Sequence, residues 1–188
     1  MIRSVITSIA AVSTAFGLGC SGNEPTEVRA INSLETQILA TALRGSTVAV
    51  AGSGIDHLTS AVVHSTKPTP TGFVRRSTEI IELTGDLKGR VLYHVTTVVD
   101  TVEGRLENTG HQVYSGTVAG SAPVMVHDDR FRFEIDLKTG REQGRVYLFN
   151  HIAGPRVKCE LHVVGTGMNA DGNPTFTYKG ECRFTNSA

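Results

Sequence analysis

Apolar and polar residues alternate along much of the chain, most clearly at residues 131–138. The apolar positions of that segment are Phe131, Phe133, Ile135 and Leu137, and every residue between them is charged. This period of two predicts an antiparallel strand with one side in a core and the other in water. Further runs rich in β-forming residues lie at 47–51, 58–64, 73–83, 89–101, 111–118, 145–152, 159–163 and 176–184.

Turn-forming residues separate these runs, and no regular alternation of strand and helix signals a parallel sheet. The segment 66–72 holds two prolines and is expected to be an exposed loop. We therefore predict an all-β domain over residues 46–188, as an antiparallel barrel or sandwich of about eight strands. A barrel is favoured because closure removes the exposed edges of a sheet, and the 20 glycines of the chain help it to curve.

The last two runs predict a hairpin, because a segment dense in turn residues, 168–174, lies between them. One register matches the apolar faces of its two strands. In that register the facing pairs are Cys159 with Cys182, Leu161 with Gly180, and Val163 with Tyr178. A disulfide between Cys159 and Cys182 is then expected if the two residues form the closer, non-hydrogen-bonded type of pair. The alternative is two buried free thiols.

Before the strands, residues 25–43 carry apolar side chains at spacings of three and four, which predicts an amphipathic helix. Pro25 suits its first turn, and Gly45 suits its end. We expect this helix to pack on the domain behind it, since Arg29 and Arg44 alone give it too little positive charge for a membrane-surface helix. Residues 20–45 are thus expected to form a tether and a helix.

Residues 1–19 have the order of a signal peptide: a basic start, an apolar stretch from Val5 to Phe16, and small residues before Cys20. This stretch is shorter than the ~20 residues of a membrane-spanning helix. The cysteine after small residues resembles the lipobox of bacterial lipoproteins, which implies lipid attachment at Cys20 and, in a diderm host, the outer membrane. Gly17 stands where that family has leucine. Cleavage that releases a soluble secreted protein is the alternative, and an unmodified mature N-terminus in a mass spectrum would exclude the anchor.

Charge and composition narrow the partners. Lysine and arginine number 18 and aspartate and glutamate 18, so the chain has no electrostatic preference for nucleic acid. The seven histidines show no local spacing typical of a zinc site, so we expect no metal and no cofactor. The sequence contains no nucleophile elbow, phosphate loop or dinucleotide fingerprint.

A few residues are candidates for chemistry. Glu79 and Glu82 point to opposite faces of one predicted strand, so one of them faces the interior, where its pKa would rise and it would serve as an acid or base. Whether His94 faces in or out is open. The segment 127–130 (His-Asp-Asp-Arg) is expected to be a solvated turn. Tyr93 and Tyr178 either line a ligand pocket or are part of the core.

The stretch from Glu79 to Phe184 resembles small secreted bacterial β-barrels related to the allene oxide cyclase and dirigent barrel. The resemblance lies in 85–89 (GDLKG), 114–120 (YSGTVAG), 165–167 (GTG) and 178–180 (YKG). It implies a barrel whose interior holds apolar ligands, and no catalytic residue carries over.

Three functions follow as expectations. The first is a cell-envelope lipoprotein whose barrel binds a small apolar ligand or a protein partner without chemistry. The second is a secreted isomerase or cyclase acting inside the barrel, and the third is a structural envelope module. A filled interior would favour the structural role. A cavity with convergent polar groups would favour binding, and a perturbed carboxyl or histidine within it would favour catalysis.

Overall fold

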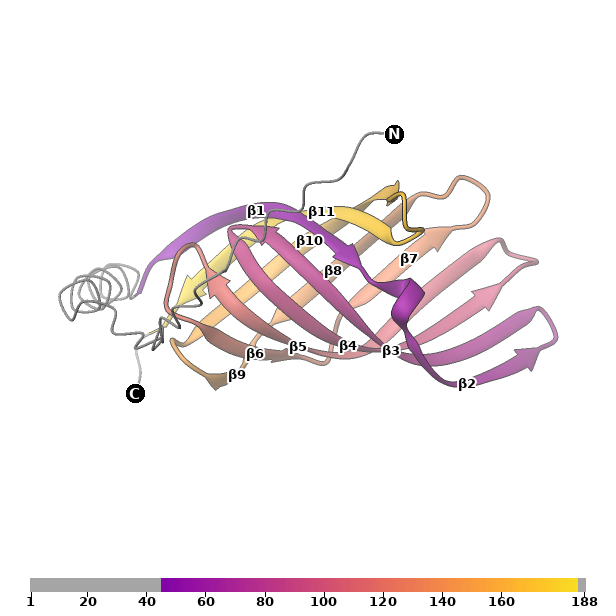
Figure 1. Ribbon diagram of the computed structural model, residues 1–188, viewed down its shortest axis with the longest axis horizontal. Helices are drawn as coiled ribbons and strands as arrows, with labels where there is room; N and C mark the ends of the chain where they lie inside the picture. Colours follow the sequence, from indigo (N-terminus) through magenta and orange to yellow (C-terminus); the bar gives the residue numbers. More distant parts are fainter. Residues whose placement is uncertain (1–44, 186–188) are drawn as a thin grey trace, which may run out of the picture.

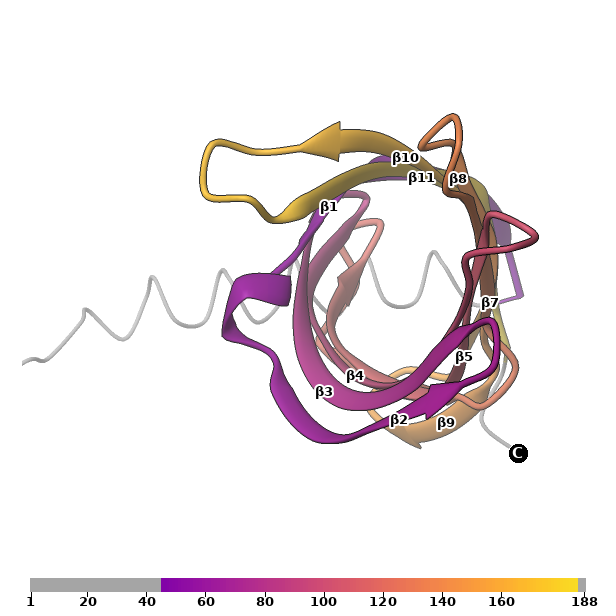
Figure 2. The same ribbon diagram turned by 90° about the vertical axis from the view of Figure 1, so that its right-hand side faces the viewer.

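The computed structural model describes residues 45–185, which form an all-β, closed antiparallel barrel of eight strands (Figures 1 and 2). The strands are β1 (Thr47–Asp56), β2 (Val62–Thr69), β3 (Gly72–Gly85), β4 (Leu87–Asp100), β5 (Arg105–Val118), β6 (Val124–Asp128), β7 (Arg132–Asp136), β8 (Glu142–Leu148), β9 (Asn150–Ala153), β10 (Val157–Met168) and β11 (Pro174–Phe184); a short 3-10 turn, η1 (Leu58–Ser60), joins β1 to β2. The predicted fold class is confirmed. The leader, Cys20 and the predicted helix lie outside the described residues.

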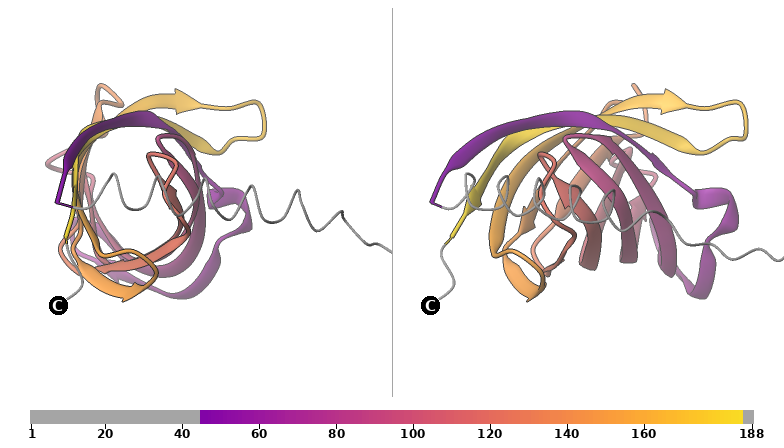
Figure 3. Two further views of the ribbon diagram at one scale, coloured as in Figure 1. Left: turned by 90° about the vertical axis from the view of Figure 1, so that its left-hand side faces the viewer. Right: turned by 60° about the vertical axis from the view of Figure 1, so that its left-hand side comes forward.

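The ring runs from β1 through β3, β4 and β5 to the place shared by β6 and β7. It continues through β8, β10 and β11, and β11 pairs with β1. Strands β6 and β7 share one place in it: β6 pairs with 112–116 of β5, and β7 pairs with 105–109. Strands β2 and β9 lie outside the ring, β2 along β3 and β9 along β6. End-on views from both sides show the closed ring (Figures 2 and 3). Within residues 45–185 no helix is long and apolar enough to cross a bilayer.

Side chains fill the barrel completely at one end. Residues that are exposed to 1% or less there include Leu87, Val118, Leu148, Val157, Cys159 and Cys182. The predicted hairpin register of β10 and β11 is confirmed at all three facing pairs. Cys159 and Cys182 form a disulfide with an S–S distance of 2.05 Å and Cα atoms 4.1 Å apart, the close type of antiparallel pair. Closing a loop of this length stabilises the fold by about 3 kcal/mol in the loop-entropy account.

The segment 127–130 corrects a prediction, because Asp128 is not in a solvated turn. It is the last residue of β6, and its side chain is fully buried. Its carboxylate accepts hydrogen bonds from Gln112 Nε2 at 2.9 Å, Arg130 N at 2.8 Å and Tyr147 N at 2.9 Å. The chain changes from β6 to β7 here, which leaves backbone N–H groups without ladder partners, and the carboxylate satisfies them. Asp129 and Arg130 are exposed, as expected.

Two further segments differ from expectation. The expected loop at 66–72 is mostly strand, because β2 runs to Thr69 along the outside of β3. Pro68 is compatible with this edge position, where a missing N–H costs no ladder bond. Leu137, expected to face the core, is 42% exposed. β7 ends at Asp136, whose Oδ1 accepts the Lys138 and Thr139 N–H groups and turns the chain away from the barrel.

Candidate functional site

A cavity of about 440 Å³ lies at the barrel end opposite the disulfide. It occupies the interior where β1 ends and η1 begins, at the end that faces the viewer in Figure 2. Its volume is that of a small-molecule site. One end of the barrel is therefore filled, and the other is hollow.

Apolar side chains line most of the cavity. Ile81, Tyr93, Phe133 and Phe176 face it, and Leu58, Leu106, Ile135, Met168 and Pro174 complete its apolar lining. The rings of Tyr93 and Phe133 pack edge to face with centroids 6.3 Å apart. This lining is suited to the hydrocarbon part of a ligand.

Three polar residues form a row across one wall. Arg75 on β3 is the register partner of Thr97 on β4, and Thr97 is the partner of Asn108 on β5. Each has a buried polar atom without a hydrogen-bond partner among the described residues: Arg75 Nε, Thr97 Oγ1 and Asn108 Oδ1. Buried polar atoms are nearly always paired in proteins, so these three require partners that the described chain does not supply, such as water or the polar atoms of a ligand. We call these three residues the polar row.

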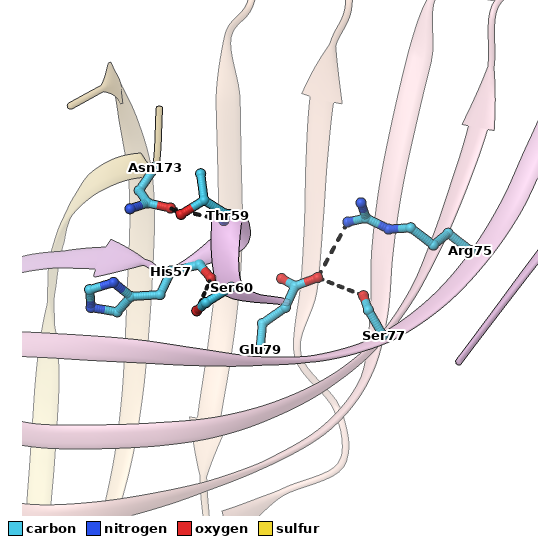
Figure 4. A network of polar contacts seen from close by, with 7 residues as sticks. All are labelled: His57, Thr59, Ser60, Arg75, Ser77, Glu79 and Asn173. Carbon is cyan, nitrogen blue, oxygen red and sulfur yellow. Dashed lines mark hydrogen bonds and ion pairs between the residues drawn. The ribbon is translucent and has the colours of Figure 1, made fainter. Parts of the chain in front are cut away.

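Two carboxyl groups lie beside the polar row. Glu79 is 3% exposed. Its Oε1 accepts hydrogen bonds from Ser77 Oγ at 2.6 Å and from Arg75 Nη2 at 3.3 Å (Figure 4). Asp56, the last residue of β1, lines the same cavity and shares a hydrogen bond with Glu79.

Asp56 holds a proton at neutral pH. Burial, and then the charge and hydrogen bond of Glu79, raise the pKa of Asp56 to about 8, and the positive charge of Arg75 only partly opposes this. Oδ1 of Asp56 is itself buried and has no hydrogen-bond partner among the described residues. We therefore assign a neutral Asp56 that donates its hydrogen bond to Glu79.

Two more titratable groups complete the electrostatics. Glu142 on β8 lines the cavity, and burial raises the pKa of its carboxyl. Burial, and then the charges of the neighbouring acids, raise the pKa of Tyr93 well above its ordinary value, so its side chain stays a phenol. Three acids and one cation thus share the cavity, which disfavours an anionic ligand.

The crossover from β1 to β2 is held in place at the cavity. Leu58 of η1 lines the cavity. Asn173, in the turn between β10 and β11, accepts hydrogen bonds on Oδ1 from Thr59 N at 3.0 Å and Thr59 Oγ1 at 2.8 Å (Figure 4). Asn173 is itself buried and donates its N–H to Asn169 Oδ1 at 2.9 Å. These bonds fix one side of the cavity before any ligand enters.

The candidate residues from the sequence lie in different places. Glu79 faces inward, as one of the two glutamates had to, and Glu82 faces outward near His57, with Nε2 and Oε2 3.7 Å apart. Tyr93 lines the cavity. Tyr178 lies deeper, where its hydroxyl accepts from Leu87 N at 2.7 Å and donates to Thr84 O at 2.9 Å. A ligand-binding role for the two tyrosines stays a prediction.

The question left open for His94 is answered: it lies on the outer face. Its Nδ1 is 2.8 Å from the Thr78 hydroxyl, and its ring stacks on His111 with centroids 4.7 Å apart. Partial burial, and then the neighbours His111 and His64, lower the pKa of His94. Within residues 45–185 no three histidine, cysteine or acidic side chains are placed to hold a metal ion.

Sequence reasoning missed Asp56, Arg75, Thr97, Asn108 and Glu142. A signal for some of them was present. Arg75 has the inward parity of Glu79 on its strand, and Asp56 follows Val50, Gly52 and Gly54 at the same parity. A polar residue at a position that alternation places in the core was the feature to look for.

Comparison with protein families, with curated proteins and with solved structures gave no match.

The raised pKa of Asp56 predicts that stability falls as pH rises. The folded protein binds this proton up to about pH 8, whereas the unfolded chain releases it near its ordinary value of 3.8. Between those values the folded state holds more protons, so each increase in pH favours unfolding, and the effect levels off above about pH 8. Asp56→Asn removes this dependence.

The measurement is the melting temperature from about pH 5 to about pH 9. We expect wild-type protein to lose ~5 °C or more relative to Asp56→Asn over this range. Asp129→Asn, at an exposed position, is the matched control and should follow the wild type. Parallel curves for wild type and Asp56→Asn would contradict the assignment of a buried, neutral Asp56.

Proposed function

We propose that the protein binds a small uncharged molecule in the barrel cavity, with an apolar body and a head group that carries a hydroxyl or carbonyl oxygen. The observation that carries this is the polar row, three register partners whose buried polar atoms face one cavity without partners of their own. Such groups cost free energy unless they are paired, which a ligand does.

The polar row specifies the head group. Arg75 Nε donates, the Thr97 hydroxyl donates or accepts, and Asn108 Oδ1 accepts. A hydroxyl group satisfies both kinds of atom, and a carbonyl satisfies the donors. The apolar lining around Phe133 and Phe176 then takes the body of the ligand. This division between a few fixed polar groups and an apolar wall is typical of small-molecule sites.

The cavity weighs against a purely structural role. The interior is packed around the disulfide, so the fold does not need a hollow end for its stability. Polar side chains at inward positions make the fold less stable than apolar side chains would. Their presence is accounted for by a ligand, and the resemblance to ligand-holding barrels of the allene oxide cyclase and dirigent type agrees with this proposal.

We also propose that the barrel works in the cell envelope, attached to a membrane through lipid on Cys20, or secreted if cleavage leaves no lipid. The leader-like order of residues 1–19 supports export. The disulfide supports an oxidising compartment, since such bonds are rare in the cytosol.

A fluorescent apolar amine, N-phenyl-1-naphthylamine, tests cavity binding. Leu106 lines the cavity, and Leu92 is 41% exposed on the same sheet, so Leu106→Trp fills the cavity and Leu92→Trp is its matched control. We expect saturable binding to wild type and to Leu92→Trp, and binding weaker by at least about tenfold in Leu106→Trp.

Competition then tests the head group. Borneol and its parent hydrocarbon bornane have the same body and differ by one hydroxyl. We expect borneol to displace the probe roughly tenfold better or more, because only borneol pairs with the polar row. Equal binding to wild type and Leu106→Trp, or no saturable binding at all, would contradict a ligand site in the cavity. Equal displacement by the two competitors would contradict the assigned role of the polar row.

A further inference from the structure

We propose that the cavity transfers protons as well as binding a ligand: Glu79 removes a proton from the carbon next to a ligand carbonyl and returns it, so the substrate class is a small enolisable or β,γ-unsaturated ketone. This inference rests on the proposed function, because the ketone must first occupy the cavity. Four side chains of the site take part. They supply the base, a second carboxyl group, and the groups that hydrogen-bond the carbonyl oxygen and stabilise its developing negative charge. They are Glu79, Asp56, Arg75 and Thr97.

The base is placed by its hydrogen bonds. Ser77 and Arg75 both donate to Oε1 of Glu79, which fixes the carboxylate. Glu79 is buried in the cavity wall, so water competes less for its oxygens than it does at the surface. Asp56 holds the one proton of the pair, and this keeps a second negative charge away from the reacting carbon.

The group that stabilises the negative charge on the enolate oxygen is the guanidinium of Arg75. Its side chain runs toward Glu79, with Nη2 3.3 Å from Oε1, while its Nε has no partner among the described residues (Figure 4). Thr97, the register partner of Arg75, presents an unpartnered hydroxyl to the same space. A ligand carbonyl that accepts from Arg75 Nε and Thr97 Oγ1 is therefore held near the carboxyl pair.

The step balances without an external reagent. Glu79 takes the proton, the C–H electron pair becomes a C=C bond, and the carbonyl π pair moves onto oxygen. The negative charge passes from Glu79 to the enolate oxygen, and the Arg75 guanidinium lies beside both positions, so little charge separation occurs. Glu79 then returns its proton to the same carbon, or to the γ carbon of an unsaturated ketone, which moves the double bond into conjugation. Nothing is oxidised, reduced or released.

Hydrogen exchange of cyclohexanone in heavy water, followed by NMR, tests this step directly. Each turnover in which the proton on Glu79 exchanges with heavy water before it is returned replaces an α hydrogen by deuterium, so loss of the α-proton signal measures the rate of these turnovers. We expect wild-type protein to exceed buffer, and Glu79→Gln to be slower by about a hundredfold or more, since the amide is no base. Glu82→Gln, on the same strand but facing outward with a half-exposed side chain, is the matched control and should keep the wild-type rate.

A second variant keeps the test valid if Glu79→Gln does not fold. Thr97→Val has nearly the same shape and lacks the hydroxyl, so it should slow exchange by roughly tenfold to a hundredfold while N-phenyl-1-naphthylamine still binds. Probe binding is measured for every variant and separates the two proposals. Exchange no faster than buffer in wild type that binds the probe would overturn proton transfer and leave ligand binding standing. Wild-type exchange rates in folded Glu79→Gln would overturn it as well, and absence of probe binding would overturn the proposed function itself.

Discussion

Closure of the sheet is the constraint on which the rest of the structure depends. Once eight strands form a ring, every second residue of each strand must face one shared interior. The parity of a position therefore decides whether its side chain lies in this interior. A side chain of the wrong kind at an inward position therefore meets low dielectric and few partners, and it must find them inside the barrel.

The two ends meet this constraint in different ways. Around Cys159 and Cys182 most inward positions are apolar, and the interior is closely packed. Tyr178 lies between the packed end and the cavity. Its hydroxyl is hydrogen-bonded to the backbone of Leu87 and Thr84. Beyond it, polar side chains join the apolar ones at inward positions, and a proton on Asp56 relieves its repulsion with Glu79. A folded core at one end thus supports a chemically unusual site at the other.

The parts that could be predicted from sequence are those decided within one strand or one hairpin. The alternation of apolar and charged residues predicted which face of β7 lies in the core, and it required either Glu79 or Glu82 to face inward. The register of β10 and β11, with its disulfide, followed because the apolar faces of two adjacent runs match in only one way. The polar row could not be found so, because Arg75, Thr97 and Asn108 come together through the register of three long strands. Asp128 was misjudged because its partners arise at a change of strand that periodicity does not show.

The central claim is that the barrel buries two carboxyl groups together and holds one proton between them. Carbon-13 NMR of the aspartate and glutamate carboxyls, titrated across pH, tests it most directly. The account predicts one aspartate carboxyl that titrates at about pH 8 and disappears from the spectrum of Asp56→Asn. If instead every carboxyl of the folded protein titrates below about pH 6, within the range of ordinary acids, the pair does not exist as described.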